Sequence, residues 1–231
     1  MLPKWFVAIY LVTEHSKGIS SVQLAHDVGV TQKTAWFMIQ RIQNAAGLPG
    51  SGEKLSGEVE IDDTYIGGKE RNKHVDKRTS GTQGLGSAKT KAVAFGMKER
   101  QGEVRAFQVP APTLRNVTPH VIQNVALGSS ISADESHAYN GLNDFYDVRR
   151  VNHSRGEYSV NGVSTNSIES FWARVKRTYN GTHHWWSRKH TQKYLDGCAF
   201  RENAGRGAGL AALLNVGMVP AAILPYRELT Q

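Results

Sequence analysis

The sequence predicts an α/β protein: a mixed sheet flanked by helices, preceded by a small all-α domain. Two changes along the chain carry this prediction. Helical periodicity fills residues 1–46, and from Glu58 onward apolar residues alternate at every second position. Between these regions, residues 47–57 (GLPGSGEKLSG) are rich in glycine, proline and serine, which is typical of a linker. We therefore expect an N-terminal domain at 1–46, a linker at 47–57 and a second domain at 58–231.

The N-terminal domain is expected to contain three helices, the first of which opens at Pro3. Ser20 or Ser21 can cap a short second helix, Gly29 makes a turn, and Thr31 can cap a longer third helix. This order is the pattern of a helix-turn-helix, a module that places its second helix in the major groove of DNA. The alternative is an ordinary three-helix subdomain.

Charge and composition favour a polyanionic partner. The 231 residues include 28 Lys or Arg and 20 Asp or Glu, which gives a net charge of +8 and a pI of about 9.6. We expect Lys33 and Arg41, both on the third helix, to face DNA. The only cysteine is Cys198, which excludes a disulfide framework and a cysteine-based zinc site. No apolar run reaches the roughly 20 residues that span a bilayer, so no membrane partner is expected.

The second domain alternates between strand-like and helix-like patterns. Strands are expected at 58–66, 92–97, 104–109, 130–134 and 146–151. Helices are expected at 114–125, 168–179 and 188–203. Residues 69–91 are polar and are expected to form a loop. Strands and helices in this order are typical of a mixed α/β sheet.

Three carboxylates occupy positions where packing alone gives little reason for an acid. Asp62 lies inside the first strand, Asp134 ends a later short strand, and Glu169 lies in the first turn of the helix that carries Trp172. Carboxylates brought together repel one another unless a divalent cation neutralises them. Oxygen ligands without a His or Cys cluster favour Mg²⁺ or Mn²⁺. The pattern therefore indicates a metal site suited to phosphodiester chemistry.

Four segments of the sequence resemble the catalytic core of a known family. They are GEVEIDDTYIGGK (57–69), ISADESHAYN (131–140), TNSIESFWARVKRTYNG (165–181) and HTQKYLDGCAFREN (190–203). In this order and spacing they are similar to bacterial insertion-sequence transposases of the DDE superfamily, in particular to the ISXO-like group. The N-terminal helix-turn-helix also resembles that of this group.

The resemblance implies a ribonuclease H-like catalytic domain with Asp62, Asp134 and Glu169 as catalytic metal ligands. Two Mg²⁺ ions, with Mn²⁺ as a substitute, are the implied cofactors. The family also has a basic residue seven positions after the glutamate, and Lys176 matches it. The family usually carries a zinc ribbon before the helix-turn-helix. This sequence starts at the first helix, so we expect poor sequence preference from this chain alone.

One face of the helix at 168–179 is expected to be functional. Asn166, Glu169 and Lys176 share a helical face that is separate from the apolar stripe. We expect Lys176 and Arg177 to contact DNA phosphates two turns beyond the metal ligand, and Asn166 to support that ligand from behind. The alternative is a solvated polar face.

Two ambiguities stay open at the level of sequence. Strand alternation places Asp62 on the side of Glu60 and Asp63 on the opposite side, so either Asp63 or Glu60 can support the ligands. Trp185 and Trp186 lie in a segment rich in basic and aromatic residues. Each can stack on DNA or belong to the core.

The resemblance predicts a transposase that cuts DNA at the ends of an element and joins the freed 3′ ends to target DNA. The expected partners are double-stranded DNA, both terminal repeats and target, and further copies of the chain in a homo-oligomer. The expected location is the bacterial cytoplasm, at the nucleoid. Two alternatives are another ribonuclease H-like nuclease and a sequence-specific DNA-binding protein without catalysis. Metal-dependent nicking of plasmid DNA separates these functions.

Overall fold

The computed structural model describes residues 2–47, 52–68, 74, 76, 91–134, 137–150 and 164–217. The chain divides into two compact units. One comprises Glu53–Ala173, and the other combines Met1–Gly52 with Arg174–Gln231. The N-terminal helices therefore share a unit with the C-terminal helices. The domain boundaries expected from the sequence stay a prediction, and most of the expected loop at 69–91 lies outside the described residues.

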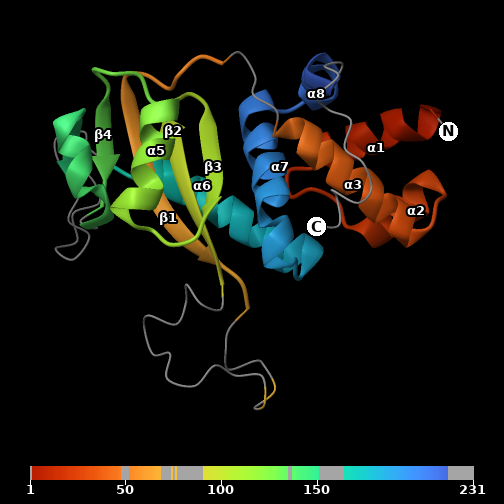
Figure 1. The fold of residues 1–231 in the computed structure, drawn as a ribbon. Coiled ribbons are helices and arrows are strands. Elements are labelled where there is room, and N and C mark those ends of the chain that lie inside the picture. The colour runs from red at the N-terminus through yellow and green to blue at the C-terminus, as the bar shows by residue number, and fades with distance from the viewer. Residues whose placement is uncertain are drawn as a thin grey trace. The chain divides into compact units, whose positions relative to one another are not determined.

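The Glu53–Ala173 unit is built on a five-stranded sheet (Figure 1). Its strands are β1 (Glu58–Ile66), β2 (Ala92–Glu99), β3 (Val104–Val109), β4 (Ser130–Ala133) and β5 (Asp147–Arg150), in the order β3-β2-β1-β4-β5. The first three strands pair antiparallel, whereas β4 runs parallel to β1 and β5 runs parallel to β4. This mixed sheet has the strand order of a ribonuclease H-like fold, and the expected fold class is confirmed.

One face of the sheet packs against α5 (Leu114–Asn124) and the helical turn η3 (His137–Asp144). Alternate strand residues such as Ile61 and Phe95 are fully buried there. The helical side of this core consists of Val117, Val121, Tyr139 and Leu142. Because strand side chains alternate between faces, this core fixes which residues of β1 point the other way.

The opposite face of the sheet is covered by the first part of α6 (Asn166–Thr178). A Cβ atom built on Gly96 of β2 would stand 2.5 Å from the Trp172 side chain and 3.0 Å from that of Ile168. Such a contact leaves no room for a side chain, so Gly96 permits the close approach of helix and strand.

The other unit is all-helical in its described residues. Its helices are α1 (Leu2–Glu14), α2 (Ser21–Val28), α3 (Gln32–Ala46), α7 (Thr191–Ala204) and α8 (Gly209–Gly217), with the turns η5 (Tyr179–His183) and η6 (Arg188–His190). α2 and α3 begin at the predicted caps. Ser20 Oγ accepts a hydrogen bond from Gln23 N at 3.1 Å, and Thr31 Oγ1 accepts one from Thr34 N at 3.2 Å. The N-terminal three-helix region is therefore confirmed.

α8 was not expected from the sequence, because its Gly/Ala-rich residues carry no cap signal. Leu213 of α8 is buried in one cluster with Ala8 and Val12 of α1, so tertiary packing supports this short helix. α8 is apolar, yet neither it nor any other helix in the described ranges is long and apolar enough to cross a membrane.

Candidate active site

The parallel pairing of β1 and β4 brings two predicted carboxylates together. Glu60 of β1 lies opposite Ser132 of β4. Two residues further along each chain come Asp62 and Asp134, the latter directly after β4. Neighbouring strands lie about 4.8 Å apart and side chains return to the same face at every second residue. The register therefore brings both carboxylates to one face of the sheet.

The third predicted carboxylate comes from α6, which covers that same face. Across β1 and β2, Asp62 lies opposite Gly96, the residue that Trp172 of α6 approaches. Glu169 lies in the first turn of α6 and is exposed. The Thr165 hydroxyl donates a hydrogen bond to Glu169 Oε1 at 2.8 Å, which holds the carboxylate at the start of the helix.

Asp62, Asp134 and Glu169, here called the carboxylate edge, interact electrostatically. Burial is the largest cause that raises the pKa of Asp62 to about 7, and the charges of Asp63, Asp134 and Glu169 add to it. The backbone N–H of Asp63 opposes this shift by donating to Asp62 Oδ1 at 2.8 Å. A carboxyl with this pKa is poised between its charged and neutral forms near neutral pH. Added positive charge near Asp62 would therefore favour its ionised form.

Asp63 lies on the opposite side of β1 from Asp62. Its Oδ1 accepts a hydrogen bond from the Tyr139 hydroxyl at 3.0 Å. Burial and the charge of Asp134 raise the pKa of Asp63, and the bond from Tyr139 opposes them. Burial and the neighbouring carboxylates raise the pKa of Tyr139 far above its ordinary value, so this hydroxyl keeps its proton and remains a donor. Tyr139 thus holds Asp63 on the face of the sheet opposite to Asp62.

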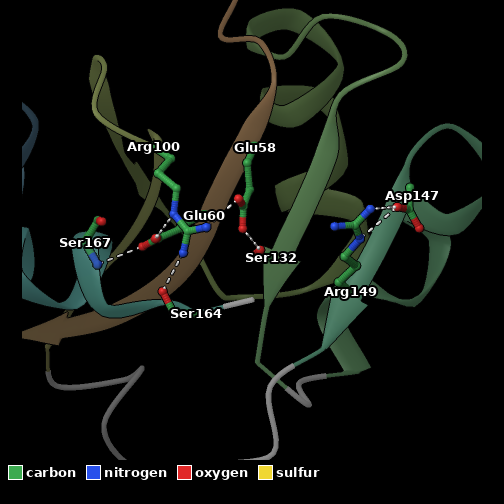
Figure 2. A network of polar contacts seen from close by, with 8 residues as sticks. All are labelled: Glu58, Glu60, Arg100, Ser132, Asp147, Arg149, Ser164 and Ser167. Atoms are coloured by element: carbon green, nitrogen blue, oxygen red, sulfur yellow. Dashed lines mark hydrogen bonds and ion pairs between the residues drawn. The ribbon is translucent and has the colours of Figure 1, made fainter. Parts of the chain in front are cut away.

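Glu60 connects β1 to the beginning of α6 (Figure 2). Its side chain is fully buried, and Oε2 accepts hydrogen bonds from the backbone N–H groups of Ser167 at 2.8 Å and Ile168 at 3.0 Å. The first N–H groups of a helix have no partner within the helix, and a negative charge there also interacts favourably with the helix dipole. Glu60 therefore caps α6 from a different element, one turn from Glu169.

Arg100, just after β2, completes this network (Figure 2). Its Nη1 lies 2.5 Å from Glu58 Oε2, its Nη2 donates to Ser164 Oγ at 2.9 Å, and its Nε lies 4.0 Å from Glu60 Oε1. Glu58 Oε1 in turn accepts a hydrogen bond from Ser132 Oγ of β4 at 3.2 Å. One guanidinium thereby joins β1 to the residues that precede α6.

The chemistry of the carboxylate edge fits a divalent cation. Its donors are carboxylate oxygens, which Mg²⁺ and Mn²⁺ prefer, and the raised pKa of Asp62 is the shift that a bound cation would reverse. Within the described parts of the chain, no three His, Cys, Asp or Glu side chains stand close enough to hold a metal ion as they are placed. The ligand roles of Asp62, Asp134 and Glu169 therefore stay a prediction.

The residues predicted to contact DNA are exposed and belong to the unit of N- and C-terminal helices. They are Lys33 and Arg41 on α3, and Lys176 and Arg177 in the last turn of α6. The Arg41 guanidinium lies over the Phe37 ring, 5.9 Å from its centroid. Asn166, at the start of α6, is also exposed. Exposure permits these contacts, which stay predictions.

The structure distinguishes Trp185 from Trp186. Trp186 is buried and stacks on Tyr194, with ring centroids 4.4 Å apart. His183 meets both rings edge-on, and burial, followed by Arg201 and His184, lowers its pKa to about 4. The imidazole is therefore neutral within this aromatic cluster. Trp185, by contrast, is 68% exposed.

Sequence reasoning missed the part that Arg100, Ser164 and Tyr139 take in this site. Arg100 stands in a turn, Ser164 precedes a helix and Tyr139 belongs to a helical turn, so no periodic pattern marks them. Glu60 was an open alternative, and the alternation of β1 correctly placed it on the side of Asp62. Its role as the cap of α6 has no signal in sequence, since 107 positions separate Glu60 from Ser167.

Comparison with known proteins identifies a matching family model. The model described as the ISXO2-like transposase domain matches residues 54–203, more than half of the chain. No curated protein matches the chain. A solved structure, the cryo-EM structure of the simian T-cell lymphotropic virus intasome in complex with PP2A regulatory subunit B56 gamma, is 10% identical with a TM-score of 0.34. That match covers 76% of this chain and 63% of the other, and similarity this distant carries no argument about function.

Proposed function

Because the chain belongs to the family of the ISXO2-like transposase domain, we propose that it cuts DNA at the ends of a mobile element and joins those ends to target DNA. The carboxylate edge is the observation that carries the proposal. Asp62, Asp134 and Glu169 come to one face of a ribonuclease H-like sheet from three separate elements. Packing alone gives no reason to gather three acids there.

The proposed reaction is an in-line displacement at a DNA phosphodiester. Two bound divalent cations supply charge stabilisation for the attacking and leaving oxygens in such reactions. Asp62, Asp134 and Glu169 would hold them, and their positive charge would favour the ionised form of Asp62. The Thr165 hydroxyl orients Glu169, and Tyr139 holds Asp63 away from the reacting face.

Binding of DNA is proposed to use the basic side chains of the helical unit. Lys33 and Arg41 of α3 would contact the element end as a helix-turn-helix does, and Lys176 and Arg177 would contact phosphates. The net charge of +8 favours such contacts. Pairing of two element ends would require a homo-oligomer, and the proposed place of action is the bacterial nucleoid.

A strand-transfer assay tests this function. Labelled duplexes carrying candidate terminal repeats are incubated with the full chain and Mg²⁺, with EDTA as the matched control. We expect nicked products to appear first and joined products later. Both should require Mg²⁺. DNA binding without any metal-dependent product would instead favour the regulator, and cleavage without joining would favour another nuclease of this fold.

A further inference from the structure

The strongest unassigned feature is the buried carboxylate of Glu60 at the beginning of α6. We propose that Glu60 and Arg100 are positioning residues that fix Glu169 relative to Asp62. This inference rests on the proposed function for its catalytic consequence. The structural part, a carboxylate of β1 capping α6, rests on the hydrogen bonds to Ser167 and Ile168 alone.

The argument begins with how Glu169 is held. A helix without a cap frays at its first turn, and Glu169 lies in that turn. Glu60 Oε2 accepts from two consecutive N–H groups there, so rotation and translation of the helix start are both restrained. Because Glu60 lies two residues before Asp62 on the same face of β1, the same strand that carries one ligand also anchors the other.

Arg100 supplies a positive charge beside the fully buried carboxylate of Glu60. A buried charge is strongly destabilising unless it is paired and hydrogen-bonded. Here Glu60 Oε2 accepts from two N–H groups of α6, and Arg100 Nε lies 4.0 Å from Glu60 Oε1, an oxygen that accepts no hydrogen bond from the described residues. The remaining Arg100 nitrogens bind Glu58 and Ser164, so the guanidinium itself is fixed in direction (Figure 2). The arrangement thus connects β1, the turn after β2 and the beginning of α6 through one set of polar contacts.

The test compares Glu60→Ala and Glu60→Gln with Glu103→Ala, an exposed acid that pairs with Arg105 on the same sheet. Amide hydrogen exchange is measured at Ser167 and Ile168, together with the Mg²⁺ concentration that gives half-maximal nicking. For Glu60→Ala we expect exchange at these two amides to rise at least about 10-fold, as for loss of a charge-assisted bond. The half-maximal Mg²⁺ concentration should rise with it. Glu60→Gln keeps the acceptor oxygen and should lie between Glu60→Ala and the wild type.

Two results would overturn the positioning role. One is unchanged exchange at Ser167 and Ile168 in Glu60→Ala, and the other is a Mg²⁺ requirement equal to that of Glu103→Ala. If Glu60→Ala does not fold, Glu60→Gln decides by the same two readouts. A folded wild-type chain without any nicking would remove the proposed function, whereas the exchange rates would still report on the cap.

A second, independent observation concerns the exposed Trp185. We propose that its indole ring stacks on an unpaired base at a DNA end, again on the premise that the chain acts on DNA. All five tryptophans lie in described residues, and Trp185 is the one classed as exposed. The neighbouring Trp186, Tyr179 and Tyr194 form a buried aromatic cluster that anchors the segment around it.

The sequence on both sides of Trp185 is rich in positive charge, as expected for a segment that binds nucleic acid. Residues 170–195 contain six Lys or Arg and no Asp or Glu, and Lys176, Arg177, Arg188 and Lys189 are exposed. His184, directly before Trp185, has a φ of +58°, a conformation that costs a non-glycine residue energy and turns the chain sharply. Aromatic stacking combined with cations along the backbone is the usual chemistry for binding unpaired nucleotides.

The experiment measures binding of two probes, a blunt 20-base-pair duplex and the same duplex with four unpaired nucleotides at one end. The wild type should bind the frayed duplex at least about 5-fold more tightly, the lower range of one stacked base. Trp185→Ala should remove this preference, and Trp185→Phe should keep part of it. Tyr10→Ala, which changes another exposed aromatic in the same unit, should keep all of it.

A Trp185→Ala variant that keeps the full preference would overturn the stacking role, as would a wild type that binds both probes equally. Unchanged binding of the blunt duplex by Trp185→Ala would leave the proposed DNA-binding function in place. Failure of the wild type to bind either probe would remove that function instead, so the two failures are distinguishable.

Discussion

Two regions of this molecule concentrate charges of opposite sign, and they differ in how far those charges are exposed to solvent. The carboxylate edge gathers three acids at one face of a sheet, and burial of Asp62 raises the pKa of that residue to about 7, whereas Glu169 is exposed. Residues 174–195 contain six Lys or Arg and no Asp or Glu, and four of these cations are exposed. Exposed like charges are screened by water and salt, whereas buried like charges must be protonated or neutralised by a cation. This difference is what the proposed function expects if the acidic region binds a cation and the basic region binds a polyanion.

The largest expected effect concerns the acidic region. Asp62→Asn, Asp134→Asn and Glu169→Gln each remove one charge of the edge while keeping shape, and nicking should fall at least about 100-fold, as when a single charge stabiliser is lost. DNA binding should persist, because the basic residues are unchanged. Nicking of plasmid DNA and a filter-binding assay measure the two effects. If a variant nicks DNA at the wild-type rate, the residue changed in that variant is not a metal ligand.

The next effect sharpens the comparison, because the unit of N- and C-terminal helices also contains a carboxyl with a raised pKa. Burial raises the pKa of Asp196 on α7 to about 7, although Gln192 donates to its Oδ1 at 2.7 Å. The folded state therefore holds this proton more tightly than the unfolded chain. The free energy of unfolding should fall as pH rises from about 4 to about 7. Asp196→Asn should remove the share of this loss that Asp196 contributes, a gain on the order of 4 kcal/mol at pH 8 with little change at pH 4. The share contributed by Asp62 should remain. Urea unfolding at both pH values checks it, and an equal effect at pH 4 and pH 8 would contradict it.

A smaller effect concerns the packing that covers the acidic region. In Gly96→Ala the added methyl would meet Trp172 and Ile168 of α6, and overpacking of this kind typically costs about 1–3 kcal/mol. We expect a lower unfolding free energy and weaker nicking, because the displaced helix carries Glu169. Gly68→Ala, at a position with nothing within 4 Å of a Cβ, is the matched control and should leave both quantities unchanged.

The smallest effect concerns the basic region. Lys176→Ala should remove one phosphate contact. The plot of log affinity against log salt concentration should therefore become shallower by about one unit of slope. Binding isotherms at several NaCl concentrations measure this slope. If Lys176→Ala and wild type have the same slope, the residue lies on a solvated face. The variant should not change the Mg²⁺ requirement, which separates it from variants of the acidic region.

The sequence was informative where local rules decide the structure. Alternation in β1 placed Asp62 and Glu60 on one face. Residue type at a helix start predicted the cap Thr31 and limited the other cap to Ser20 or Ser21, of which the structure shows Ser20. Interactions between distant segments were not predictable. The bonds from Ser167 and Ile168 to Glu60 depend on the approach of α6 to β1, and the burial of Trp186 rather than Trp185 depends on its stacking against Tyr194.

The central claim is that the acidic region is built for a cation. The pKa values of Asp62 and Asp196 test it most directly, because the two values are similar before a cation is added. Asp62 and Asp196 both have a pKa raised to about 7, but charges of neighbouring carboxylates contribute only to the first shift. Carboxyl ¹³C chemical shifts are followed against pH, with and without Mg²⁺. We expect Mg²⁺ to lower the pKa of Asp62 by more than one unit and to leave that of Asp196 unchanged. An Asp62 pKa that does not respond to Mg²⁺, or an equal fall at both residues, would contradict the account.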